Sequence, residues 1–205
     1  MKNLIKTDII IEEMSREFQR SPFDFLYESD IQGLLYSRLR EELKDDVTGM
    51  EAGTYYPDHF EKREQVKTSI VKTEYPSAVK GLGLPGRFDI AVLNDEKSYR
   101  RVDINIEGLA NEIFWNLPVT IGLEIKLFRP GDKISYMFNR FRADIEKLES
   151  YSKKVESPFF GRALLFVLSY MKCEEQIKNW ISAHTLSYKR ITGRIVTPDQ
   201  IFTMP

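Results

Sequence analysis

The sequence predicts an α/β fold in which a central mixed sheet is flanked by helices. Segments with apolar residues at every third or fourth position alternate with segments of two-residue alternation, which are the periodicities of helices and strands. The order of these segments, with Gly161–Tyr170 as the most buried-looking strand, is typical of a sheet that is at least partly parallel. The 205 residues, of which 42% are apolar and 30% charged, match one globular domain.

The first part of the chain is predicted to be helical. Apolar side chains recur at helical spacing from about Pro22 to Leu43, with Ser21 as the preceding cap and Pro22 at the first helical position. A shorter helix from about Asp8 to Phe18 precedes this one. Residues Lys44–Tyr56 contain two consecutive aspartates and two glycines, so we expect a loop there.

Strands and helices then follow in an order typical of a covered sheet. The alternating patterns predict strands at Gln65–Glu74, Arg87–Leu93, Arg101–Ile106 and Val119–Phe128. The later elements are a helix from about Ile134 to Lys154, the buried strand, a helix over Cys173–Thr185 and a strand over Arg190–Val196. We expect a single domain over residues 1–205, with a helical extension at 1–21, a core at about 22–170 and a C-terminal helix and strand at 171–205.

Composition excludes several classes of protein and of site. The formal net charge of -1 excludes a strongly basic domain, although 30 lysines and arginines can still form local patches. One cysteine excludes an internal disulfide, and two histidines mean that any metal is held mainly by carboxylates, which favours Mg²⁺ or Mn²⁺. No apolar run approaches the ~20 residues of a membrane span. The first residues also lack the apolar stretch of a signal peptide, so we expect no membrane association and a cytoplasmic location.

Two charged residues interrupt the otherwise apolar strand Val119–Phe128. Because side chains alternate along a strand, Glu124 and Lys126 point to the same face. Isolated buried charges are costly, so charges that persist in such a strand are paired or bind a metal. Asp89 lies on the strand Arg87–Leu93, and if the two strands pair, Asp89 and Glu124 converge where they can hold one Mg²⁺.

This pattern resembles the motif of the PD-(D/E)XK nuclease superfamily, which has the restriction-endonuclease-like fold with an αβββαβ core. Asp89 matches the family's first aspartate, and Glu124–Ile125–Lys126 matches its (Asp/Glu)-x-Lys. Phe88 stands where the family's name has proline, a departure that many members share. The resemblance implies that Asp89 and Glu124 hold the metal, and that Lys126 and Glu28, the acid on the first core helix, complete the catalytic set.

Two of these positions have alternatives in the sequence. Asp103 lies in a similar Arg-x-Asp strand, closer to Glu124, and we prefer Asp89 because a Gly-Pro loop precedes its strand. Asp30 is the alternative to Glu28 on the helix.

The long helix offers further charged residues. Its Asp144-x-x-Lys147-Leu run is similar to one in many family members, but a plain intrahelical ion pair is the expectation for two residues three apart. Lys133, Arg140 and Lys147 share one face, which is either a solvated helix face, the usual case, or a phosphate-contacting rim. Tyr136 is expected in the core.

The resemblance implies Mg²⁺- or Mn²⁺-dependent hydrolysis of phosphodiester bonds in DNA. The alternatives are a catalytically silent nuclease-like domain that binds nucleic acid or protein, and a plain α/β domain within a larger complex. Because the chain is not strongly basic, we expect weak intrinsic affinity for DNA, a homodimer or a partner protein.

Overall fold

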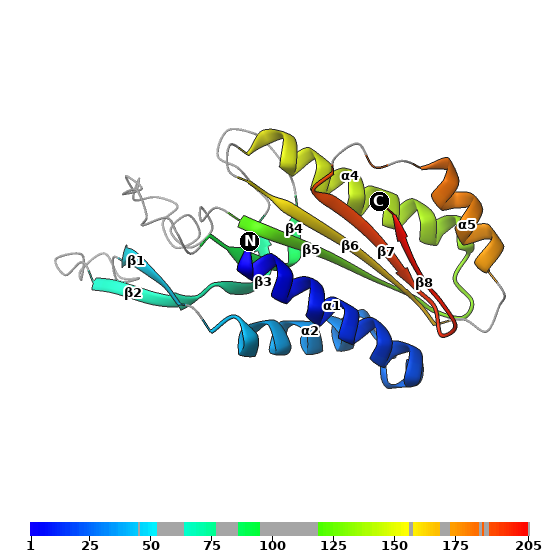
Figure 1. Cartoon of the computed structure of the whole chain (residues 1–205), viewed down its shortest axis with the longest axis horizontal. Helices are drawn as coiled ribbons and strands as arrows, with labels where there is room; N and C mark the ends of the chain where they lie inside the picture. Colours follow the sequence, from blue (N-terminus) through cyan, green and yellow to red (C-terminus); the bar gives the residue numbers. More distant parts are fainter. Residues whose placement is uncertain are drawn as a thin grey trace.

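A six-stranded mixed sheet forms the centre of the molecule, with helices on both faces (Figure 1). The computed structural model describes residues 1–44, 46–52, 64–76, 86–94, 119–155, 158–168, 173–184, 186 and 189–204. The sheet consists of β3 (Val71–Pro76), β4 (Arg87–Leu93), β5 (Val119–Phe128), β6 (Phe160–Val167), β7 (Ile191–Val196) and β8 (Ile201–Met204), in that order. The helices are α1 (Lys2–Arg20), α2 (Glu28–Glu42), α4 (Ile134–Lys154) and α5 (Glu174–Ala183).

The direction of the strands follows from their connections. β3, β4 and β5 pair antiparallel, β5, β6 and β7 pair parallel, and β8 returns antiparallel to β7. The helix α4 joins β5 to β6, as a parallel pair requires a crossover connection. The prediction of a partly parallel sheet with helices on its faces is therefore confirmed, and so is the pairing of Arg87–Leu93 with Val119–Phe128.

Each face of the sheet has its own aromatic packing. On the side of α1, the rings of Phe18 and Phe166 meet edge to face with centroids 5.1 Å apart. On the side of α4, the ring of Phe88 packs on Tyr151 with centroids 5.0 Å apart. Gly122 of β5 lies under that second cluster, and a Cβ there would come within 2.9 Å of the Phe88 ring. The missing side chain therefore lets the rings of Phe88 and Phe159 pack against the backbone of β5.

Some predicted boundaries were wrong. In place of the predicted helix Pro22–Leu43, a single 3-10 turn at Pro22–Asp24 is followed by α2. Asp30 accepts hydrogen bonds from the backbone N–H groups of Leu26 and Tyr27, and the helix therefore begins at Glu28. The helix expected at Asp8–Phe18 extends over the whole of α1.

The strand predictions also needed correction. The region expected to be a loop contains β1 (Asp46–Ala52), which pairs with β2 (Glu64–Ser69). The predicted strand Gln65–Glu74 is divided between β2 and β3 at Ile70. β8 was not predicted, and Arg101–Ile106 lies outside the described residues.

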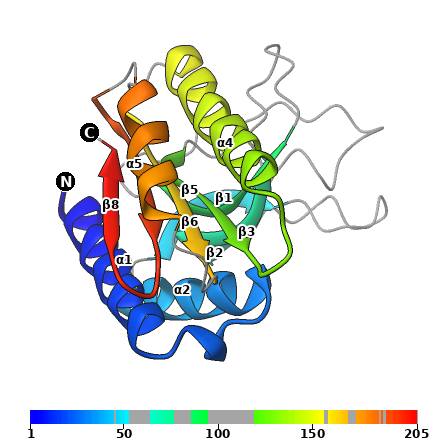
Figure 2. The same ribbon diagram turned by 90° about the vertical axis from the view of Figure 1, so that its right-hand side faces the viewer.

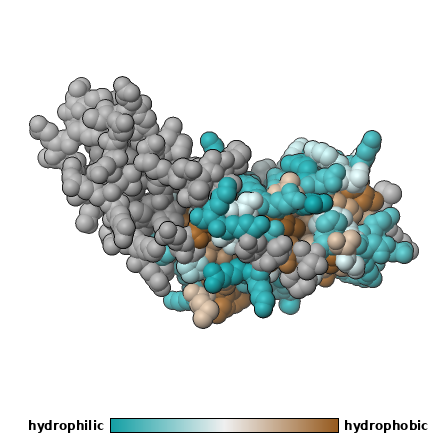
Figure 3. Space-filling view, turned by 90° about the horizontal axis from the view of Figure 1, so that it is seen from above, coloured by the Kyte–Doolittle hydropathy of each residue, from teal (hydrophilic) through white to brown (hydrophobic). Residues whose placement is uncertain are grey.

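One face of the described part shows mostly polar side chains. Seen from above, hydrophilic residues surround smaller apolar areas (Figure 3). Among the described residues, no helix has both the length and the apolar character needed to cross a bilayer.

Candidate active site

The sheet opens between β4 and β5 at the position of Asp89. The two strands are paired from Leu93 opposite Val119 to Ile90 opposite Leu123. Beyond this point the Oδ2 atom of Asp89 accepts a hydrogen bond of 2.6 Å from the backbone N–H of Ile125. A side-chain carboxylate thus takes the place of a backbone partner, and it lies at the gap between the strands.

α2 holds the backbone at this opening. The amide of Gln32 donates a 2.8 Å hydrogen bond to the carbonyl oxygen of Asp89 and a 3.2 Å hydrogen bond to Oε1 of Glu74. Glu74 itself has a φ of 49°, in the left-handed region that residues other than glycine rarely adopt. Strained residues of this kind cluster at functional sites, and this one lies on the strand next to Asp89.

Lys126 extends its ammonium group among three carboxylates from three different elements. Its Nζ atom lies 3.5 Å from Glu28 of α2, 3.7 Å from Asp89 of β4 and 3.4 Å from Asp144 of α4. The same atom donates a 2.8 Å hydrogen bond to the carbonyl of Ile125. The Lys126 side chain is only 13% exposed, so these contacts form in a largely desolvated space.

Glu124 lies beside this group and is more deeply buried, with 2% of its side chain exposed. The Lys147 ammonium lies 2.7 Å from Oε1 of Glu124, and Lys147 also donates to the backbone carbonyl of Arg87. Because Asp144 and Lys147 lie on one helix and contact Lys126 and Glu124 respectively, both β5 side chains lie on the face covered by α4. The alternation predicted from the sequence is therefore present.

Two carboxylate oxygens remain without a hydrogen bond of acceptable geometry among the described residues. They are Oε1 of Glu124 and Oδ2 of Asp144, and both are buried. The Lys126 ammonium lies 3.4 Å from Oδ2 of Asp144 and the Lys147 ammonium 2.7 Å from Oε1 of Glu124, and both supply the opposite charge. Buried acceptors in this state are costly and mark a place where a donor or a cation would be stabilised.

Burial has the largest single effect on the pKa of each of four side chains in the cluster, Asp89, Glu124, Lys126 and Asp144. It raises the pKa of Glu124 to about 8, with a further contribution from the Asp89 charge and an opposing one from Lys147. It raises the pKa of Asp144 to about 6, against the opposing charge of Lys126, and it also raises the pKa of Asp89. Burial lowers the pKa of Lys126, but the surrounding carboxylates outweigh this effect and raise it. Lys126 therefore carries its charge at neutral pH, and Glu124 holds a proton there when no cation is bound.

The structure brings together all four residues predicted for the site. Asp89, Glu124 and Lys126 meet at the opening of the sheet, and Glu28 joins them from the first turn of α2. Asp30 instead caps that helix. Asp103 lies outside the described residues.

The expectation of an intrahelical pair on α4 was wrong. Asp144 and Lys147 both reach across to β5, where they pair with Lys126 and Glu124. A signal for this was present in the sequence, because the two residues directly precede the apolar stripe residues Ile145 and Leu148 and so border the buried face.

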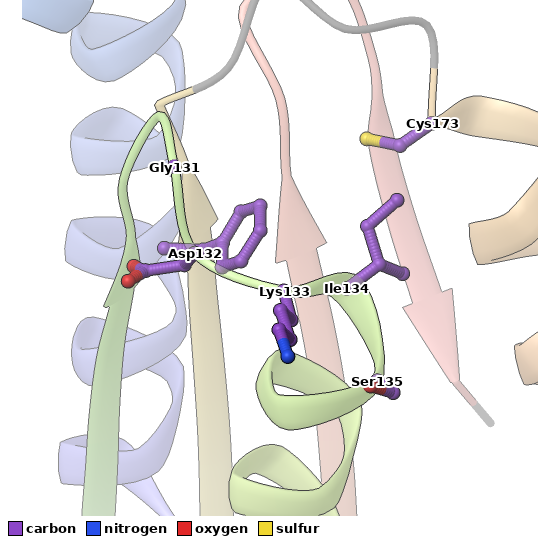
Figure 4. A pocket seen from close by; sticks show the side chains of 7 residues that line it. Gly131, Asp132, Lys133, Ile134, Ser135 and Cys173 are labelled. Atoms are coloured by element: carbon purple, nitrogen blue, oxygen red, sulfur yellow. The ribbon is translucent and has the colours of Figure 1, made fainter.

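A separate cavity of about 470 Å³ lies at the start of α4, in the loop that leaves β5 (Figure 4). It is lined by Phe128, Gly131, Asp132, Lys133, Ile134, Ser135 and Cys173. Cys173 is buried, and burial raises the pKa of its thiol, so it is a poor nucleophile.

Within the described part of the chain, no group of three or more histidine, cysteine, aspartate or glutamate side chains is arranged to hold a metal ion. No protein-family model, no curated protein and no solved structure matches this chain.

Proposed function

We propose that this protein is a metal-dependent phosphodiesterase that cleaves DNA, with a site of the PD-(D/E)XK type on a restriction-endonuclease-like fold. The observation that carries the proposal is the position of Lys126, whose ammonium lies within 3.7 Å of carboxylates from α2, β4 and α4 at the opening of the sheet. A lysine held in this way beside a buried glutamate resembles the arrangement that the family motif implies. A solvated surface ion pair would not require four elements to converge.

The donor set fits a hard divalent cation. Glu124 has a buried oxygen without a hydrogen bond among the described residues. When Glu124 and Asp89 are both ionised, their carboxylates repel each other. Two carboxylates with water ligands are a common way to bind Mg²⁺. Asp89 and Glu124 would therefore hold Mg²⁺ or Mn²⁺, which when bound supplies a Lewis acid for the scissile phosphate and a water of lowered pKa.

The remaining groups of the site would stabilise charge on the substrate or hold other side chains in position. Lys126 can hold an attacking water or stabilise the negative charge that develops on the phosphate. Glu28 and Asp144 keep the Lys126 ammonium charged and fix its position from two sides. The hydrogen bond from Ile125 N–H to Asp89 fixes the direction of that carboxylate.

The test combines metal binding with cleavage. We expect Mn²⁺ to raise the melting temperature of the wild type and to support cleavage of linear duplex, single-stranded or branched DNA. Glu124→Gln should lose both responses, whereas Lys126→Ala should lose cleavage but keep the Mn²⁺ response. Lys178→Ala, which removes an exposed lysine on α5, and Glu146→Gln on the outer face of α4 serve as matched controls.

The outcomes separate the proposal from its alternatives. Cleavage that survives both Lys126→Ala and Glu124→Gln would contradict the mechanism. Binding of DNA without cleavage or a Mn²⁺ response would favour the catalytically silent binding module. Homodimer formation stays a prediction, which sedimentation of the purified protein would check.

A further inference from the structure

Two tyrosines near the proposed site are exposed and each has an arginine over its ring. Tyr27 is 60% exposed and the Arg129 guanidinium lies 5.9 Å from its ring centroid. Tyr136 is 56% exposed and the Arg140 guanidinium lies 5.7 Å from its ring centroid. The expectation that Tyr136 belongs to the core was therefore wrong, although its neighbour Phe138 is buried.

Both pairs are built on the segments that form the site. Tyr27 directly precedes Glu28, and Arg129 follows Lys126 by three residues at the end of β5. The end of β5 and the start of α2 lie on the same side of the molecule (Figures 1 and 2). This arrangement puts the first pair immediately beyond the contact between Glu28 and Lys126.

The second pair continues from the site along α4. Residues 136, 140 and 144 are spaced by four, so Tyr136, Arg140 and Asp144 follow one another on one side of the helix. Asp144 contacts Lys126, and the two outer residues lie toward the start of α4, which is the end nearer to the loop after β5. The two tyrosine–arginine pairs thus lie on the same side of the site, on different elements.

The chemistry of each pair suits an unpaired nucleotide. An exposed aromatic ring offers a face on which a base can stack without regard to its identity. A neighbouring guanidinium contacts the phosphate and adds a cation–π contribution. In a duplex the face of each base is covered by the neighbouring bases, so a base there cannot stack on an exposed tyrosine ring.

We propose that the preferred substrate is single-stranded DNA, or an unpaired segment of a larger DNA, whose bases stack on Tyr27 and Tyr136 while its phosphates contact Arg129 and Arg140. This inference rests on the proposed function, because it identifies the pairs as the path by which the strand reaches the site. It assigns substrate selection to residues that are not part of the carboxylate and lysine cluster.

The binding test uses the full chain in the presence of EDTA, so that cleavage does not enter the measurement. The probes are a fluorescein-labelled 20-nucleotide oligo(dT) and a labelled 20-base-pair duplex, followed by anisotropy. We expect tighter binding of the single strand, a loss of about tenfold for Tyr27→Ala or Tyr136→Ala, and a larger loss for the double variant. Duplex binding should change little.

A matched control is provided by α2 itself. Arg40 lies over the ring of Tyr36 at 5.9 Å, in the same kind of pair, but about 18 Å along the helix from Glu28. Arg129→Ala should weaken single-strand binding and make it less sensitive to salt, whereas Arg40→Ala removes the same charge and should leave both unchanged. Circular dichroism establishes that each variant is folded.

The results distinguish this inference from the proposed function. Wild-type protein that binds neither probe, or binds the duplex more tightly, overturns the inference. Equal effects of Arg40→Ala and Arg129→Ala overturn it as well, since the loss would then reflect net charge alone. Cleavage of single-stranded DNA with Mn²⁺ that is insensitive to both tyrosine substitutions would leave the catalytic site intact and contradict only the single-strand path. Single-strand binding that needs the tyrosines but is never followed by cleavage would support the path and contradict the nuclease.

Discussion

Lys126 on β5 and Asp144 on α4 approach each other to 3.4 Å across the interface between the sheet and the long helix. Both side chains are only 13% exposed, so the pair forms where water is largely excluded. Charge pairs in such surroundings are sensitive to the loss of one partner, because the other is left buried without compensation. The cluster around this pair therefore makes predictions about stability as well as about cleavage.

The metal-free protein should be more stable in mild acid than in mild base. Glu124 has a pKa of about 8 in the folded protein, above its ordinary value of 4.5, so the folded state binds more protons than the unfolded state between these values. The free energy of unfolding should therefore fall as the pH rises through this range, by an amount on the order of 3 kcal/mol. Urea unfolding at pH 5 and pH 8.5 in EDTA measures the difference.

Glu124→Gln provides the control for the pH effect. The variant should be more stable than the wild type at pH 8.5, and its free energy of unfolding should fall much less as the pH rises. A small fall should remain because the pKa values of Asp89 and Asp144 are also raised. A wild-type protein equally stable at both pH values would contradict the burial of Glu124.

Removal of the Lys126 ammonium should destabilise the metal-free protein. Lys126→Ala leaves Glu28, Asp89 and Asp144 facing one another without a cation, and we expect a loss on the order of 3 kcal/mol. Saturating Mn²⁺ should recover part of this loss. Thermal unfolding with and without Mn²⁺, beside the exposed-lysine variant Lys178→Ala, checks the prediction; a Lys126→Ala protein as stable as the control would mean that the carboxylates do not depend on the lysine.

Asp144 is expected to position Lys126 without contacting substrate. Asp144→Asn keeps the shape of the side chain but removes one of the charges that hold the ammonium, so kcat should fall by about ten- to a hundredfold while KM stays near the wild-type value. Glu146→Gln, which alters the exposed pair with Arg142 on the same helix, should leave both constants unchanged. Equal kcat values for the two variants would contradict a positioning role for Asp144.

Two glycines should respond in opposite directions to alanine. Gly122→Ala places a methyl group within 2.9 Å of the Phe88 and Phe159 rings and should cost about 1–3 kcal/mol. Gly33→Ala on α2 meets no atom within 4 Å and should stabilise the protein by about 1 kcal/mol through helix propensity. Calorimetry of both variants measures the signs, and a Gly122→Ala protein as stable as the wild type would contradict the close packing of the Phe88 and Phe159 rings on β5.

Local periodicity was sufficient to predict the elements that carry the site. Arg87–Leu93, Val119–Phe128 and Ile134–Lys154 have the predicted boundaries because each pattern is long and is ended by turn residues. The start of α2 was not predicted, since it depends on which carboxylate accepts the free N–H groups. Asp30 accepts them from Leu26 and Tyr27, and the helix begins at Glu28, six residues beyond the expected start at Pro22.

The site was predicted only in part, because some of its side chains are positioned by contacts between elements that are distant in the sequence. Glu124 and Lys126 are conspicuous because they interrupt an apolar strand, and Asp89 is conspicuous beside them. Asp144 and Lys147 lie in a helix with many charges, and their spacing fits a local pair as well as a contact with another element. Only the packing of α4 on the sheet shows that both side chains turn toward β5.

The hydrogen bond from the Ile125 amide to Asp89 gives the molecule an internal spectroscopic probe. The chemical shift of that amide proton depends on the charge and distance of the carboxylate oxygen, which lies 2.6 Å from the nitrogen. A cation that binds to Asp89 draws electron density from the same oxygen, and the Ile125 resonance should move more than the amides of β5 that are remote from Asp89 and Glu124. Titration of isotope-labelled protein would therefore locate the ion at a named atom before any nucleic acid is added.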